Sequence, residues 1–256
     1  MVAMLVHQCI SPLPARVDRR NMQKPRHYPF ISYVLTKPRT CTEITSDESK
    51  NVYKDNWFDL LAINHISKSF QASTGFRSSK GGYDGFVEAA TMATKLFTPT
   101  GQQRIVNQTL DMAFPRPILN MIRTLMPQSR YTREFFAVFT TIFFAWLVGP
   151  CEVKESEFNG RKEKNVVHIK KCRFLEETNC VGMCTNLCKM PSQAFIQESL
   201  GMPTTMVPNF EDMSCEMIFG QQPPPPASDP AFTQQCYKQC NYLKINLSLS
   251  NNFGIA

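Results

Sequence analysis

The sequence lacks several features that would assign it to a common class. None of its ten cysteines forms a Cys-x-x-Cys pair, and no spacing matches a ferredoxin run or a zinc ribbon. A secretory signal with a clean apolar core is missing, which argues against extracellular disulfides. There is no internal repeat or heptad array. The most apolar run, at residues 135–148, is shorter than the roughly 20 residues that a membrane-spanning helix needs.

Acidic residues are scarce at the N-terminus, and this scarcity accounts for most of the net charge of +7. Residues 1–42 hold seven Lys and Arg against one acid, Asp18, and so contribute +6, which leaves +1 for the other residues. The charge therefore does not indicate a nucleic-acid partner, and we expect none. An Arg-rich, acid-poor leader is typical of a disordered organelle transit peptide that is removed on import. The alternative is a basic tail that stays attached.

Helical periodicity dominates residues 51–150. Apolar residues recur there at every third or fourth position, which predicts a first helix with one buried stripe. That stripe consists of Tyr53, Trp57, Leu60, Leu61, Ile63, Ile66 and Phe70. Further helices are predicted at about residues 83–97, 101–113 and 117–126. Asp84 is placed to cap the first of these three.

Residues 135–148, FFAVFTTIFFAWLV, are the most apolar segment. A run of this length predicts a core helix, and the alternative is a helix lying in a membrane interface with Arg130 and Arg133 at its aqueous end. Its aromatic side chains would also suit a pocket for a long apolar ligand. These aromatic residues are Phe135, Phe136, Phe139, Phe143, Phe144 and Trp146.

A strand pattern begins after Pro150. The segments CEVKESEF and NVVHIKKCRFLE flank Asn159-Gly160, a dipeptide that tolerates the positive φ of a tight hairpin turn. His168 and Cys172 would share one face of the second strand and point either toward the other cysteines or into solvent. A short helix and an irregular stretch through Cys215 are expected next. The pattern predicts an α+β fold that is dominated by helices, with a small antiparallel hairpin or sheet and a Cys-rich C-terminal region.

Cysteine is concentrated after residue 150. Eight of the ten lie there: Cys151, Cys172, Cys180, Cys184, Cys188, Cys215, Cys236 and Cys240. On an ideal helix, Cys180 and Cys188 would be about 12 Å apart, too far to bind one ion directly. Either the helix is broken, with Gly182 the expected place, or only two of the three four-spaced cysteines are ligands. The others would then come from Cys172, Cys215, Cys236, Cys240 or His168.

Thiols at this density are typical of a metal or redox site. The residues alone leave three chemistries open: redox-active or catalytic iron, structural zinc, and disulfides or inert thiols. With structural zinc the protein would be a metal-stabilised interaction module without a reaction. A thiol–disulfide redox protein is the remaining alternative, although the usual Cys-x-x-Cys motif is missing.

Several long segments of the chain are distinctive enough to compare with known families: LVGPCEVKESE, KKCRFLEETNCVGMCTNLCKMP, FIQESLGMPTTMVPNFEDMSCEMIFGQ and SDPAFTQQCYKQC, with YDGFVEAA and FPRPILNMIRTLMP upstream. On these segments the chain resembles the plant plastid β-carotene isomerase family, which opens strigolactone biosynthesis. The resemblance implies a chloroplast enzyme that uses iron to convert all-trans-β-carotene to the 9-cis isomer. It places the isomerase-family region at residues 151–240, after a helical region at 51–150. The tail at residues 241–256 departs from the family's usual ending.

Under this resemblance we expect iron, either mononuclear or in an iron–sulfur cluster, close to a groove for carotene. The expected ligands are Cys180, Cys184, Cys188 and Cys215, with Cys172 and His168 as substitutes or as neighbours of the ligands. Oxygen ligation of mononuclear iron by Glu152, Glu155 and Asp212 is the alternative. β-Carotene has no polar group, so its affinity must come from buried hydrocarbon, and the aromatic residues of 135–148 would supply it. A carotenoid substrate also implies transient contact with a membrane surface.

Overall fold

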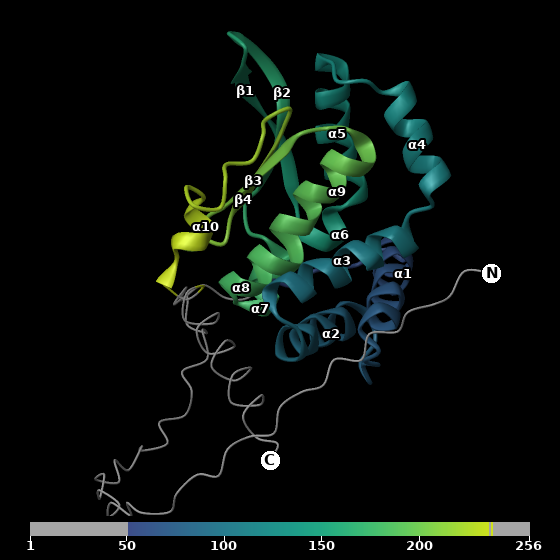
Figure 1. Cartoon of the computed structure of the whole chain (residues 1–256). Coiled ribbons are helices and arrows are strands. Elements are labelled where there is room, and N and C mark those ends of the chain that lie inside the picture. Colours follow the sequence, from purple (N-terminus) through teal and green to yellow (C-terminus); the bar gives the residue numbers. More distant parts are fainter. Residues whose placement is uncertain (1–50, 236, 238–256) are drawn as a thin grey trace, which may run out of the picture. The chain divides into compact units, whose positions relative to one another are not determined.

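The computed structural model describes residues 51–235 and Tyr237, shown in colour in Figure 1. The expected transit peptide at 1–42, Cys236, Cys240 and the tail at 241–256 lie outside the described residues. The described part is rich in helices and contains one small antiparallel sheet, so the predicted α+β class is confirmed. Its first half contains α1 (Trp57–Thr74), α2 (Gly82–Leu96), α3 (Pro99–Ala113), α4 (Arg116–Leu125), α5 (Arg130–Phe143) and α6 (Ala145–Val148).

The sheet has the strand order β1-β2-β4-β3, and every neighbouring pair is antiparallel. Its strands are β1 (Cys151–Phe158), β2 (Arg161–Ile169), β3 (Thr204–Pro208) and β4 (Cys215–Phe219). The predicted Asn-Gly hairpin is confirmed, because Asn159 and Gly160 both take positive φ between β1 and β2. In Figure 1 the helices α1–α4 lie to the right of the sheet and the segment that contains α10 (Pro230–Thr233) lies to its left.

Two predictions about the strands were wrong. The second strand ends at Ile169 and does not continue through Cys172, because the Cys172 N–H donates to the Met213 carbonyl and the chain turns into α7 (Arg173–Thr178). The stretch through Cys215 is not irregular. It contains β3 and β4, whose short lengths of five residues give little alternation for a sequence pattern to detect.

The buried stripe predicted for α1 is only partly correct. Ile63 and Phe70 are buried, as expected, and α1 packs against α2 and α3. Trp57, by contrast, is 78% exposed, and Leu60 and Leu61 are exposed too. Asn56 forms a capping box with Asp59, which fixes where the helix starts. Trp57, Leu60 and Leu61 therefore face away from the core at the start of α1, whereas Phe58 packs against it.

Helix α2 begins at Gly82, and Asp84 is not its N-cap. Gly81 occupies that position with an extended backbone, three residues before the predicted cap, and Gly82 takes a positive φ, so the two glycines make the turn into the helix. Asp84 lies in the first turn, where its negative charge interacts favourably with the positive end of the helix dipole. Helices α3 and α4 start one or two residues earlier than predicted, because Pro99 and Pro117 occupy their first turns.

The apolar segment at residues 135–148 forms parts of two helices, α5 and α6, that meet at Phe144. One face of α5 packs on the sheet, and there Arg133 donates two hydrogen bonds of 2.7 Å to Glu163 of β2. Phe136 and Trp146 are buried, which agrees with the predicted core helix. Phe135 and Phe143 are exposed, so the prediction holds for one face only. Within the described residues, no helix is both long enough and apolar enough to traverse a bilayer.

A candidate site lined by four cysteines

A helix break at Gly182 was one of the two alternatives for the cysteine segment, and it is not present; the chain breaks just before Cys180 instead. Helix α7 ends at Asn179, which takes the left-handed conformation that Asn tolerates better than most residues. Cys180 is extended and precedes α8 (Val181–Met183), which contains Gly182. A π-helical turn, η1 (Cys184–Lys189), follows, and α9 (Met190–Leu200) continues from it. Such turns are rare and occur often at functional sites.

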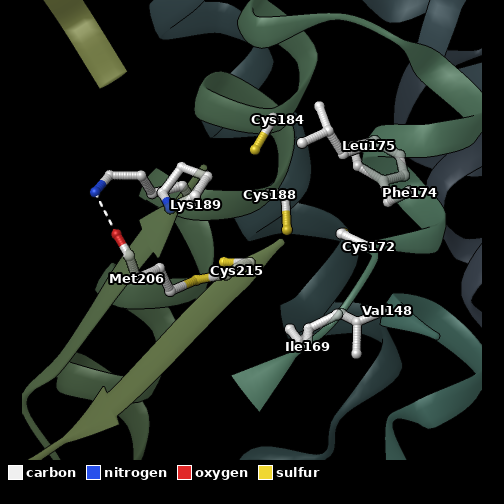
Figure 2. Close-up of a pocket in the computed structure, with 11 residues that line it drawn as sticks. Val148, Ile169, Cys172, Phe174, Leu175, Cys184, Cys188, Lys189, Met206 and Cys215 are labelled. Carbon is white, nitrogen blue, oxygen red and sulfur yellow. Dashed lines mark hydrogen bonds between the residues drawn. The ribbon is translucent and has the colours of Figure 1, made fainter. Parts of the chain in front are cut away.

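Four cysteines from three separate segments line one buried pocket, which Figure 2 shows. Cys172 lies at the start of α7, Cys184 and Cys188 lie in η1, and Cys215 begins β4. The other lining residues are Val148, Ile169, Phe174, Leu175, Lys189, Met206 and Pro208. The space that they enclose holds no more than about one water molecule. The pocket is therefore the size of an ion and not of a carotenoid.

Sheet register brings Cys172 and Cys215 to the same place. Ile169, the last residue of β2, pairs with Cys215, the first residue of β4. Cys172 follows Ile169 by three residues, and its backbone N–H donates a hydrogen bond to the carbonyl of Met213, which lies just before β4. Sequence spacing gave no sign of this pairing. It gave no sign of Lys189 or Met206 either, which also line the pocket.

Two residues of the expected ligand set lie outside the pocket wall. Cys180 is half-buried beside the core and does not line the pocket. His168 points to the opposite face of β2 from Ile169, and its Nδ1 lies 3.3 Å from Glu216 Oε1.

The three alternative oxygen ligands are not in the pocket wall either. Glu152 lies beside Lys154 and Lys170 at the edge strand β1, which also carries Glu155. Asp212 accepts a hydrogen bond from the Ser214 N–H in a turn before β4. Within the described residues, the structure thus groups sulfur and not oxygen donors around the pocket.

Burial raises the pKa of all four pocket thiols. The pKa of Cys188 rises to about 12, and those of Cys184 and Cys215 rise well above the ordinary value. Neighbouring thiols raise the pKa of Cys184 and Cys215 further, whereas the Lys189 ammonium group opposes the rise. As free thiols these groups are protonated at neutral pH, so any metal that binds them must displace protons.

The pocket fits a soft metal in donor type but is not a preformed coordination site. Within residues 51–235, no three Asp, Glu, His or Cys side chains are already arranged around one point as metal ligands. Four thiols nevertheless surround a space of about atomic size, and thiolates are the ligands of zinc and of iron–sulfur centres. Coordination would therefore require the cysteine side chains to turn further into the pocket.

Two buried charge clusters hold the walls of the pocket in place. Lys189, only 2% exposed, forms an ion pair of 2.7 Å with Asp229 and donates to the Met206 carbonyl at 2.5 Å. On the opposite side, Arg173 of α7 pairs with Asp55 and lies over the Tyr83 ring, 3.8 Å from its centroid. The first cluster joins η1 to β3 and, through Asp229, to the start of α10, and the second joins α7 to the residues just before α1.

Glu176 ties the segment before α1 to α7. Its carboxylate accepts hydrogen bonds from the Asn51 N–H at 2.9 Å and the Tyr53 hydroxyl at 2.7 Å, and it pairs with Lys171 at 3.2 Å. Burial alone would raise its pKa, but these three partners outweigh burial and lower it. The Glu176 carboxylate therefore binds a proton less readily in the folded state than in the unfolded chain.

The Glu176→Gln variant is expected to lose part of the acid sensitivity of the fold. A lowered pKa in the folded state gives stability above the unfolded pKa of about 4.3, and this stability is lost as the pH falls through the lower folded pKa. Urea unfolding at a series of pH values below 5 should show a shallower decline for this variant than for the parent. Glu198→Gln, which removes an exposed carboxylate from α9, is the control and should follow the parent.

The six aromatic residues predicted to form a carotene groove do not line this pocket. Phe136 and Trp146 belong to the core, Phe139 and Phe144 are half-buried, and the other two are exposed. Val148, at the end of the same apolar segment, does reach the pocket. The segment thus leads from the protein surface to the cysteines.

Comparison with known proteins agrees with the resemblance seen in the sequence. The profile of the family described as "Beta-carotene isomerase D27-like, C-terminal" matches residues 146–228, which include the four pocket cysteines. The chain is 64% identical over 224 residues to "Beta-carotene isomerase D27, chloroplastic" of Medicago truncatula, an alignment that covers 86% of this chain and 87% of that protein. It is 47% identical over 229 residues to the protein of the same name in Arabidopsis thaliana, with 88% and 87% covered. No solved structure matches. The chain therefore belongs to the D27-like family of β-carotene isomerases.

Proposed function

We propose that this protein is a chloroplast enzyme that isomerises all-trans-β-carotene to 9-cis-β-carotene, the first step of strigolactone biosynthesis. The observation that carries the proposal is 64% identity, over 86% of the chain, to a relative named as a chloroplastic β-carotene isomerase. The basic, acid-poor composition of residues 1–42 suits a chloroplast transit peptide. The partners proposed are a carotenoid and a membrane surface, and not a nucleic acid.

Iron is the proposed cofactor, held by cysteines of the pocket. Cys172, Cys184, Cys188 and Cys215 are favoured as ligands because they line one space of about atomic size. Cys180 and His168 are less favoured, since neither lines that space. Iron would lower the barrier to rotation about a conjugated double bond, through one-electron exchange or contact with the π system, without net oxidation of the product. The cluster type is left open.

The residues of the chain supply the surroundings of this chemistry. Leu175 and Ile169 are fully buried in the pocket wall and exclude water from it. Lys189 places a positive charge beside the thiols and would favour their deprotonated form. The substrate, a long hydrocarbon, cannot enter a space that holds one water molecule, so it must reach the pocket wall from outside. The apolar segment that ends at Val148 is the proposed route.

Anaerobic purification of the protein, followed by an assay, tests the proposal. We expect bound iron with visible absorption, and formation of 9-cis-β-carotene from the all-trans isomer, separated by chromatography. Bound zinc without visible absorption and without product would instead favour the metal-stabilised interaction module. A labile disulfide found by mass spectrometry after thiol alkylation, again without product, would favour the thiol redox protein.

A further inference from the structure

The outer face of α5 is apolar over its whole length. Tyr131, Phe135, Val138 and Ile142 follow one another at steps of four, three and four residues, which places them on one face of the helix. All four are exposed, Ile142 by 63% and Tyr131 by 84%. An ordinary surface helix carries polar side chains on its outer face. Helix α5 thus carries apolar side chains on its exposed face as well as at its buried positions Phe136 and Ala137.

Aromatic contacts extend this face to the first turn of α1. Phe143, at the end of α5, packs edge-to-face against Phe58 of α1 with ring centroids 5.9 Å apart. Phe58 contacts Trp57 in the same way at 6.1 Å. We call the combined surface the apolar face, and its exposed members are Trp57, Leu60, Leu61, Tyr131, Phe135, Val138, Ile142 and Phe143. Exposed apolar residues grouped in this way mark an interaction site.

Two basic residues, Lys68 and Arg130, lie at the margin of the apolar face. No charged residue occurs between Phe135 and Pro150. Lys68 shares the outer face of α1 with Trp57 and Leu61, because it follows Leu61 by seven residues. Arg130 lies at the start of α5 and is more than half exposed. Asp59 is engaged in the α1 capping box, and Glu134 pairs with Arg130 and accepts from the Lys164 N–H, which leaves Lys68 as the unbalanced charge among these residues.

We propose that the apolar face docks the enzyme on a lipid bilayer that contains anionic lipids, with α5 lying along the membrane surface. Aromatic and aliphatic residues on one side of a helix, with basic residues at the margin, are the features of helices that lie in the membrane interface. The choice of lipid over a second protein chain rests on the proposed function, since β-carotene is a hydrocarbon that dissolves in bilayers and not in water. Docking places the aromatic segment that leads to Val148 against the phase that holds the substrate.

Flotation of the full chain with vesicles of phosphatidylcholine and phosphatidylglycerol tests the proposal. The parent protein should float with the vesicles, less so at high salt because the basic margin is then screened. The double variant Phe135→Gln/Ile142→Gln should bind at least about tenfold more weakly, since two exposed apolar side chains no longer enter the lipid. The matched control is Leu96→Gln/Val207→Gln, which changes two exposed apolar residues on α2 and β3 and should bind like the parent.

Two outcomes would overturn the proposal. Either the Phe135→Gln/Ile142→Gln variant floats as well as the parent, or the parent does not float. A parent that does not float but is a dimer in light scattering, and that the same variant makes monomeric, would assign the apolar face to a second copy of the chain.

The isomerase assay separates this proposal from the proposed function. The variant for this assay is Trp57→Gln/Leu61→Gln, whose residues belong to the apolar face on α1 and lie outside the proposed substrate route at residues 135–148. With β-carotene held in vesicles, this variant should convert substrate several-fold more slowly than the parent. With β-carotene in detergent micelles the two should be equal. If the parent forms no product in either format, the proposed function fails, and the flotation result still decides whether the face binds lipid.

Discussion

The Cys184→Ser variant is expected to lose both bound iron and isomerase activity while keeping its fold. Cys184 is buried in η1 and lines the pocket together with Cys172, Cys188 and Cys215. A serine hydroxyl occupies less space and is a poor ligand for a metal that is otherwise bound by sulfur. We expect the iron content and the rate of 9-cis-β-carotene formation to fall to background. Metal analysis and the isomerase assay on anaerobically purified protein measure both.

Two control variants make this prediction specific. Cys151→Ser replaces a half-buried thiol of β1 that lies outside the pocket wall, and it should retain iron and activity. Cys180→Ser is the second control. The ligand set expected from the sequence includes Cys180 and the set that lines the pocket does not, so this variant should also retain iron. Circular dichroism confirms that each variant is folded. Full activity in an iron-free Cys184→Ser protein would contradict the proposed role of iron.

The fold was predictable wherever the signal was local. The Asn159-Gly160 turn depends on two neighbouring residues that tolerate positive φ, and the structure has it. The helices were recognised from their periodicity, with errors of one or two residues at ends where proline or glycine starts the first turn. The exposed residues of α1 and α5 were not predictable in this way. Periodicity identifies an apolar face, but it does not say whether another element covers that face.

The site was predictable in residue type but not in membership. The four-residue spacing identified Cys184 and Cys188, which both line the pocket. It also included Cys180, because the chain break that moves this residue away depends on the left-handed turn at Asn179. Cys172 lines the pocket because of the pairing between β2 and β4, a contact between segments distant in sequence. Local patterns contain no information on such a pairing.

Breaking the buried ion pair between Lys189 and Asp229 is expected to destabilise the fold strongly. Both residues are 2% exposed, and their charged atoms are 2.7 Å apart. Lys189→Met removes the cation and leaves the Asp229 carboxylate buried without it. Removal of one partner of such a pair costs about 3–5 kcal/mol. Urea unfolding followed by circular dichroism should show a correspondingly lower midpoint, whereas Lys162→Met, at an exposed position of β2, should change little.

The double variant Lys189→Met/Asp229→Asn separates the cost of the unpaired charge from the loss of packing. Asparagine can still accept the hydrogen bond from the Ala231 N–H that caps α10, so this cap is kept. With no charge left buried, most of the lost stability should return, and the two single substitutions should not be additive. A double variant that is less stable than either single variant would mean that the ion pair is not the main contact here. Lys189 would then act chiefly through its hydrogen bond to the Met206 carbonyl, which joins η1 to β3 beside the pocket.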